Sequence, residues 1–110
     1  MLTETRKHFS TFHGRPRFAQ VTVGRLDTQA KQGPAPRPEI SLSGHAATEF
    51  TEQDLKLMEA ARRGIHQVDL DFGWEGPQHS VVRIEGPLVD INADAAFLAA
   101  VEATKALIGL

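Results

Sequence analysis

The sequence contains no cysteine, no apolar run near the roughly 18–20 residues that a membrane span requires, and no Gly-x-x-x-x-Gly-Lys-Ser/Thr phosphate loop. The first absence excludes a disulfide framework, a thiolate nucleophile and a zinc site built on cysteine, and leaves sites built from histidine and carboxylates open. The missing loop excludes GTP hydrolysis by that mechanism. Because the basic N-terminus is followed by no apolar stretch, it does not resemble a signal peptide, and we expect a cytoplasmic protein without a membrane partner.

Length and composition fit one folded domain, residues 1–110. The chain is 41% apolar, and its nine glycines and six prolines are far from a low-complexity composition. The net charge is −2, but residues 1–40 carry seven basic and three acidic side chains, while residues 41–110 carry five and eleven. The pI of about 6.2 lies well below the roughly 9 of a dedicated nucleic-acid binder. We therefore expect no DNA partner, although the basic portion permits a local contact with phosphate.

The first half of the chain predicts two strands separated by a proline-rich loop. Residues 17–26 and 39–43 carry the apolar pattern of half-buried strands. Residues 27–38 lie between them and contain three alternating prolines, which remove backbone donors and fix φ. We expect the two strands to pair as a hairpin around this loop, and residues 1–16 to form a flexible basic segment.

Two helices are predicted from their ends and their apolar spacing. The first covers residues 51–63, because Thr51 and Asp54 have the spacing of a capping box and Gly64 follows a basic last turn. The second begins after Asn92, a good N-cap residue, and keeps helical spacing of apolar side chains up to Gly109.

Between the helices the sequence predicts two more strands. Residues 67–74 alternate strictly, residues 75–78 have turn chemistry, and residues 80–85 alternate again. The inward side chains predicted for these strands are Val68, Leu70, Phe72 and Trp74 in the first and Val82 and Ile84 in the second. The predicted fold is α+β, a two-layer β-β-α-β-β-α sandwich with a four-stranded sheet and both helices on one face.

Three stretches together resemble the fourth domain of translation elongation factor G and of the ribosomal protection proteins that confer tetracycline resistance. Residues 5–8 with 14–23 are similar to the family's Arg-Lys motif, its glycine-rich loop and the strand after it. The second stretch is the helix end at residues 63–65. Residues 85–97 are similar, with one residue missing, to a strand end, a His-Asp-Val-Asp-Ser-Ser-Glu loop and the start of the final helix.

The resemblance implies the fold of the second domain of ribosomal protein S5, a βαβ sandwich with an unusual left-handed crossover. It also implies that the loops at residues 14–19 and 87–93 lie together at one end, which in the family enters the ribosomal decoding region. The sequence departs from the family at this end, where Pro16 replaces a glycine, Arg17 a glutamine and Val89 a histidine.

The candidate binding residues are basic and aromatic side chains near the N-terminus and polar side chains in the second loop. Basic groups neutralise backbone phosphates, and an aromatic ring stacks on a base. The candidates for contacts with the ribosome or structured RNA are Arg6, Lys7, Arg15, Arg17, Phe18, Asp90 and Asn92. The alternative is a solvated, partly disordered N-terminus.

Other reactive side chains favour structural roles. The five histidines form no His-x-x-x-His pair on a predicted helix, so no metal or cofactor is expected. Asp69 and Asp71 lie two apart on a predicted strand, as a paired-carboxylate site or, more simply, as its solvent side. Trp74 continues an inward face, which favours core packing over binding. No Ser-His-Asp arrangement follows from the spacing, so we predict no enzyme activity.

The sequence leads to two main hypotheses about function. The first is a non-enzymatic module that contacts the ribosome or structured RNA through a basic two-loop tip, by phosphate neutralisation and shape recognition. The second is a homo-oligomeric or protein-interaction domain that keeps the fold without the ribosomal function, where an unpaired edge strand supports association. A small enzyme that uses Asp69, Asp71 and a histidine ranks below both.

Overall fold

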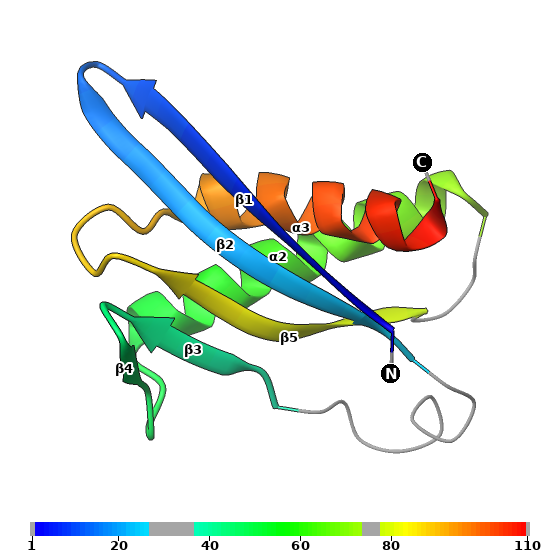
Figure 1. Cartoon of the computed structure of the whole chain (residues 1–110), viewed down its shortest axis with the longest axis horizontal. Helices are drawn as coiled ribbons and strands as arrows, with labels where there is room; N and C mark the ends of the chain where they lie inside the picture. The colour runs from blue at the N-terminus through cyan, green and yellow to red at the C-terminus, as the bar shows by residue number, and fades with distance from the viewer. Residues whose placement is uncertain (1, 27–36, 74–77, 110) are drawn as a thin grey trace.

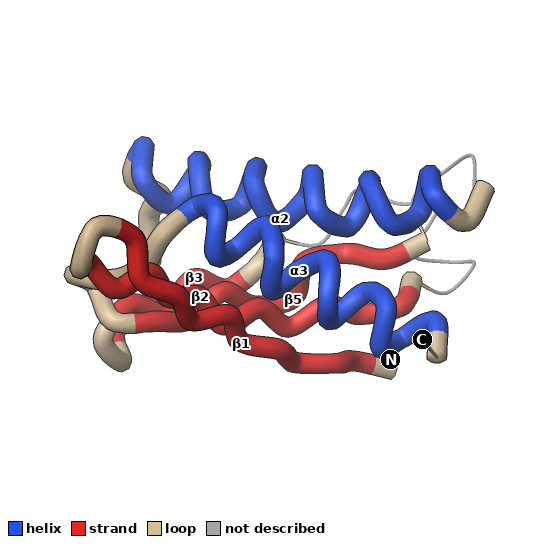
Figure 2. Tube along the Cα trace, turned by 90° about the horizontal axis from the view of Figure 1, so that it is seen from above, coloured by secondary structure: helices blue, strands red, loops and turns tan. Residues whose placement is uncertain are grey.

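The computed structural model describes residues 2–26, 37–73 and 78–109, which form a mixed sheet and two helices (Figure 1). In chain order the elements are β1 (Thr3–Phe12), β2 (Arg15–Arg25), β3 (Glu39–Leu42), β4 (His45–Ala46), α2 (Glu52–Asp71), β5 (His79–Gly86) and α3 (Ala93–Ile108). Both helices lie on the same face of the sheet, as the view from above shows (Figure 2). The predicted α+β layering is therefore confirmed, but the described sheet has five strands in place of four.

The sheet order is β1-β2-β5-β3-β4, and every neighbouring pair is antiparallel except β3 and β5. The predicted hairpin of residues 17–26 with residues 39–43 is wrong, because β5 lies between β2 and β3. Parallel neighbours need a long crossover, and α2 supplies it. The proline-rich segment falls largely outside the described residues, which resume at Arg37.

The β3-α2-β5 crossover is left-handed. In Figure 1 the helices lie behind the sheet, β3 and β5 both run to the left, and β5 lies above β3. Seen from the helix side with the strands pointing up, the second strand is thus to the left of the first. Connections of this kind are right-handed in about 98% of cases, so this topology is rare.

The N-terminal segment predicted to be flexible is a strand. Residues Thr3–Phe12 form β1, which pairs with β2 along its whole length, from Thr3 opposite Gly24 to Phe12 opposite Arg15. His13 and Gly14 make the two-residue turn, with φ of 51° and 75°. Positive φ at both positions is the geometry that matches the twist of a hairpin. Most of the loop predicted at residues 14–19 is consequently the start of β2.

Helix α2 continues through the position where the sequence predicts its end. Gly64 is helical, and the buried side chains Leu57, Ala61, Ile65 and Val68 keep a helical period into the segment predicted as a strand at residues 67–74. That strand is wrong. Of its predicted inward side chains, Val68 alone is buried among the described ones, whereas Leu70 and Phe72 are 53% and 43% exposed. Trp74 and the turn at residues 75–77 lie outside the described residues.

The core lies between the sheet and the helices. Val21, Val23, Ile40 and Ile84 of the strands are buried against Leu57 of α2 and against five alanines of α3, which are Ala95, Ala96, Ala99, Ala100 and Ala103. In β5 the buried valine is Val81, while the predicted Val82 is only half-buried. The pairing with β2 shifts there, from Thr22 opposite Arg83 to Val23 opposite Val81, so Val82 is the extra residue of a bulge.

The outer face of the sheet carries several polar contacts. The hydroxyls of Thr5 and Thr22 are 2.7 Å apart, and the Arg83 guanidinium donates to a Glu39 carboxylate oxygen at 2.6 and 2.9 Å. Hydrogen bonding to Glu39 and the charges of Glu39 and Glu85 raise the pKa of Arg83. None of the helices in the described ranges has the length and apolarity needed to cross a membrane.

Candidate nucleic-acid interface

Two segments that are distant in the sequence meet at one end of the sheet. The Phe18 amide donates to the Asp90 carbonyl at 2.9 Å, and the Asn92 amide donates to the Phe18 carbonyl at 3.1 Å. These bonds form a short parallel bridge between Phe18 and Ile91. We call the two segments, residues 12–17 and 87–92, the tip. The backbone bridge holds the second segment beside Phe18 of β2, close to the turn of the β1-β2 hairpin.

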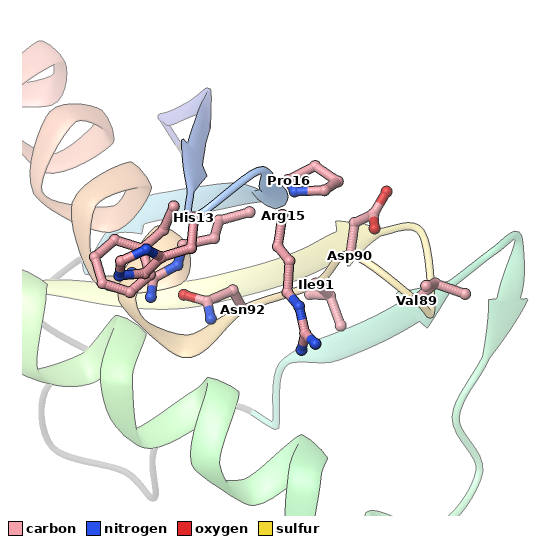
Figure 3. Close-up of a pocket in the computed structure, with 9 residues that line it drawn as sticks. His13, Arg15, Pro16, Val89, Asp90, Ile91 and Asn92 are labelled. Carbon is pink, nitrogen blue, oxygen red and sulfur yellow. The ribbon is translucent and has the colours of Figure 1, made fainter.

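A cavity of about 620 Å³ separates the two segments of the tip (Figure 3). Its lining comes from both: Phe12, His13, Arg15, Pro16, Arg17, Val89, Asp90, Ile91 and Asn92. In Figure 3 the Arg15 side chain extends from β2 toward the loop that carries Ile91 and Asn92, and the Asp90 carboxylate points away from it. The cavity is therefore open to an anion on the side of Arg15.

The second arginine of the tip is held by neighbouring side chains. The Arg17 guanidinium carbon lies 4.3 Å from the centre of the Phe12 ring, and its Nη1 is 3.4 Å from an Asp94 carboxylate oxygen. The His13 ring meets the Phe12 ring edge-on, with centroids 4.2 Å apart. Within the described ranges, by contrast, Arg15 forms no ion pair with a carboxylate. Arg15 can thus neutralise a ligand anion without first giving up an ion pair, whereas Arg17 must give up its contact with Asp94.

The structure brings together only part of the predicted site. Arg15, Arg17, Asp90 and Asn92 all line the cavity. Phe18 reaches the tip through its backbone alone, since its ring packs toward Gly86, where an ideal Cβ would lie 3.1 Å from Cδ1. Its side chain instead borders a shallower hollow on another part of the surface, with Gln20 and Glu85 among its neighbours.

Arg6 and Lys7 do not belong to the tip. They lie six and five residues before Phe12 on β1, about 17–20 Å away at strand rise. Arg6 donates to Glu4 at 2.8 Å, and Lys7 is exposed in the middle of the strand. Arg6 and Lys7 are close to Arg15 in the sequence but not in space, because Arg15 lies beside the hairpin turn and they lie halfway along β1.

Asn92 has a structural role at the start of α3. Its side-chain oxygen accepts hydrogen bonds from the backbone amides of Asp94 and Ala95, at 2.9 and 3.2 Å. We expect Asn92→Ala to lower the free energy of unfolding by about 1 kcal/mol, measured by urea denaturation. Asn92→Asp keeps the cap and is the matched control. Equal losses in both variants would contradict a capping role.

Phe12 and His13 are site residues that the sequence analysis missed. β1 and the turn after it place both residues, but the charged residues of the N-terminal segment led us to predict a flexible segment in place of a strand. The available signal was a run of threonine, histidine and phenylalanine up to Phe12, followed by His13-Gly14 in the place of a two-residue hairpin turn.

The two aspartates considered as a carboxylate pair lie in different surroundings. Asp69 is buried in α2, where its Oδ1 is 2.8 Å from Nδ1 of His79. Asp71 is exposed and accepts a bond from Gln67 at 3.0 Å. The paired-carboxylate reading is therefore wrong. Among the described side chains, no three His, Asp or Glu residues gather closely enough to hold a metal ion.

Comparison of the chain with models of protein families finds no match, and a search of curated proteins finds none either. What the tip binds must therefore be inferred from its own geometry and charge.

Proposed function

We propose that this protein is a non-enzymatic binding module, related in fold to the fourth domain of elongation factor G, whose tip contacts structured RNA on the ribosome. One observation carries the proposal. The two segments that the resemblance singles out, 73 residues apart in the chain at their bridge between Phe18 and Ile91, line a single cavity with Arg15, which forms no ion pair with a carboxylate among the described residues.

The topology supports the fold part of the proposal. The resemblance implies a left-handed βαβ crossover, and the β3-α2-β5 connection has that hand. Because this hand is rare, its agreement with the resemblance supports the proposal more than the short motifs do alone.

The chemistry of the tip suits RNA. Arg15 offers a planar guanidinium for a phosphate, and Phe12, 54% exposed, offers an aromatic ring on which an unpaired base can stack. Val89, 91% exposed within the second segment, adds an apolar contact. Since the net charge of the chain is −2, overall charge gives no attraction to RNA, and binding depends on shape as well as on the local charge of the tip.

Co-sedimentation with purified ribosomal subunits tests the proposal. We expect saturable pelleting at about 50 mM salt that weakens strongly at about 200 mM, because released counterions drive binding. Arg15→Glu is expected to lower the affinity at least about tenfold, and Arg15→Glu with Arg17→Glu to flatten the slope of log K against log salt by about 1–2.

The matched control is Arg62→Glu, which makes the same change of charge as Arg15→Glu at an exposed position of α2 that does not line the cavity of the tip. Circular dichroism of each variant checks that the fold is kept. The proposal fails if the wild-type chain does not pellet at either salt concentration, or if the tip and control variants lose affinity equally.

A further inference from the structure

The sheet ends at β1, whose outer edge is open in the described structure. The Arg25 amide donates to the Leu2 carbonyl at 2.9 Å, so these two residues form a hydrogen-bonded pair. Such pairs alternate along antiparallel strands. The even-numbered residues of β1 thus bond to β2, and the odd-numbered residues direct their N–H and C=O groups outward. These are Thr3, Thr5, Lys7, Phe9 and Thr11, all exposed.

This edge has few of the features that protect edges from pairing. β1 is ten residues long, contains no proline, and pairs with β2 without a bulge from Thr3 to Phe12. Short strands, prolines, bulges and charged side chains are the usual protection. Lys7 is the one charged residue among the five whose backbone groups point outward. A long regular edge of this kind is a template for strand addition.

We propose that a second copy of this chain pairs with β1, antiparallel, about a two-fold axis at Thr5, so that the two sheets become continuous. In this register Glu4 of each copy lies opposite Arg6 of the other. Both side chains are on one side of the strand, since Glu4 Oε2 and Arg6 Nη1 are 2.8 Å apart within the chain. Directly opposite Cβ atoms are about 4.5–5.5 Å apart, so pairing builds a ring of four alternating charges.

The charge pattern selects both the register and the occupant. Axes at Glu4, Arg6 or Lys7 place a charged side chain opposite its own copy, which is destabilising. The axis at Thr5 places a neutral residue there and opposite charges on either side. An unrelated strand has no reason to carry this pattern, whereas a second copy carries it by symmetry.

The helix layer allows the pairing. α3 packs against both β1 and β2. With strands about 4.8 Å apart, a helix centred over that pair lies about 4.8 Å from the axis, and the two copies of α3 then lie about 10 Å apart, which is a normal helix packing distance. The tip lies at least seven residues from Thr5, so it stays free. Self-association and RNA binding are therefore separable.

Single cysteines test the register, because the chain has no native thiol. Thr5→Cys places two thiols across the axis, within the Cα distance of about 4.4–6.8 Å that a disulfide needs. Thr11→Cys is the matched control, since it changes the same residue type on the same exposed edge, and its two copies lie about 40 Å apart in this register. We expect the disulfide dimer to form at least tenfold faster with Thr5→Cys. Equal rates would overturn the register.

Sedimentation velocity of the unmodified chain tests the association itself. We expect a dimer that grows with concentration over the micromolar range. Glu4→Arg or Arg6→Glu should raise the Kd at least about tenfold, because four like charges then meet, and the exchange Glu4→Arg with Arg6→Glu should restore it. A monomer at several hundred micromolar, or an exchange that fails to restore the dimer, overturns the proposal. Neither result affects the ribosome experiment.

Discussion

The Asp69→Ala substitution is expected to lower the free energy of unfolding by about 3 kcal/mol. Asp69 and His79 are both buried, and their side chains meet at 2.8 Å. The other carboxylate oxygen of Asp69 accepts from the Gln78 amide at 3.3 Å. Alanine removes both acceptors while the His79 ring stays buried and the Gln78 amide stays part-buried, and it releases the end of α2 from the start of β5.

Asp71→Ala is the control, because the residue is on the same helix turn but exposed. Its expected effect lies within about 0.5 kcal/mol. Urea denaturation of both variants, of His79→Ala and of the double variant gives the coupling between Asp69 and His79, which we expect to be about 1–3 kcal/mol. If the Asp69 and Asp71 variants lose the same stability, the buried pair does not hold these elements together.

The starts of both helices and the end of α3 could be predicted from the sequence because their causes are local. Thr51 and Asp54 make the expected reciprocal bonds, at 2.9 and 3.2 Å. Asn92 caps α3, and Gly109 ends it with a φ of 94°. Each of these features depends on residues within four positions, so no tertiary information is needed to recognise it.

The errors occurred where distant contacts decide the structure. Residues 67–71 alternate as a strand would, but Val68 and Asp69 are buried through contacts of α2 with β5 and the rest of the core, and helix packing determines the result. The place of β5 between β2 and β3 is also invisible in the sequence, because strand order depends on which hydrophobic faces meet.

The candidate site was predictable only in part for the same reason. Arg15, Arg17, Asp90 and Asn92 were named through a resemblance that joined two distant segments, and these residues do line one cavity. Arg6 and Lys7 were named through the Arg-Lys motif of the same resemblance and as part of the basic cluster, but the length of β1 separates them from the tip. Phe12 and His13 become visible only once the hairpin turn at His13 and Gly14 is known.

The Gly64→Ala substitution is expected to lower the free energy of unfolding by about 2 kcal/mol. In an unobstructed helix the change would raise stability by about 1 kcal/mol. An ideal Cβ at position 64, however, lies 2.6 Å from the Phe97 carbonyl oxygen and 3.2 Å from the Ala100 Cβ. The Phe97 contact is with backbone, which cannot turn aside, so α2 and α3 must separate. Overpacking of this kind costs up to about 3 kcal/mol.

Arg62→Ala, on an exposed position two residues earlier, gives the same product residue in α2 without touching α3, and its expected effect is within about 0.5 kcal/mol. A stabilised Gly64→Ala variant would show that the helices do not meet closely at this point. The contact also bears on the tip, because α3 begins there. A variant that stays folded with α3 displaced is expected to lengthen the 3.4 Å contact between Arg17 and Asp94 at the tip.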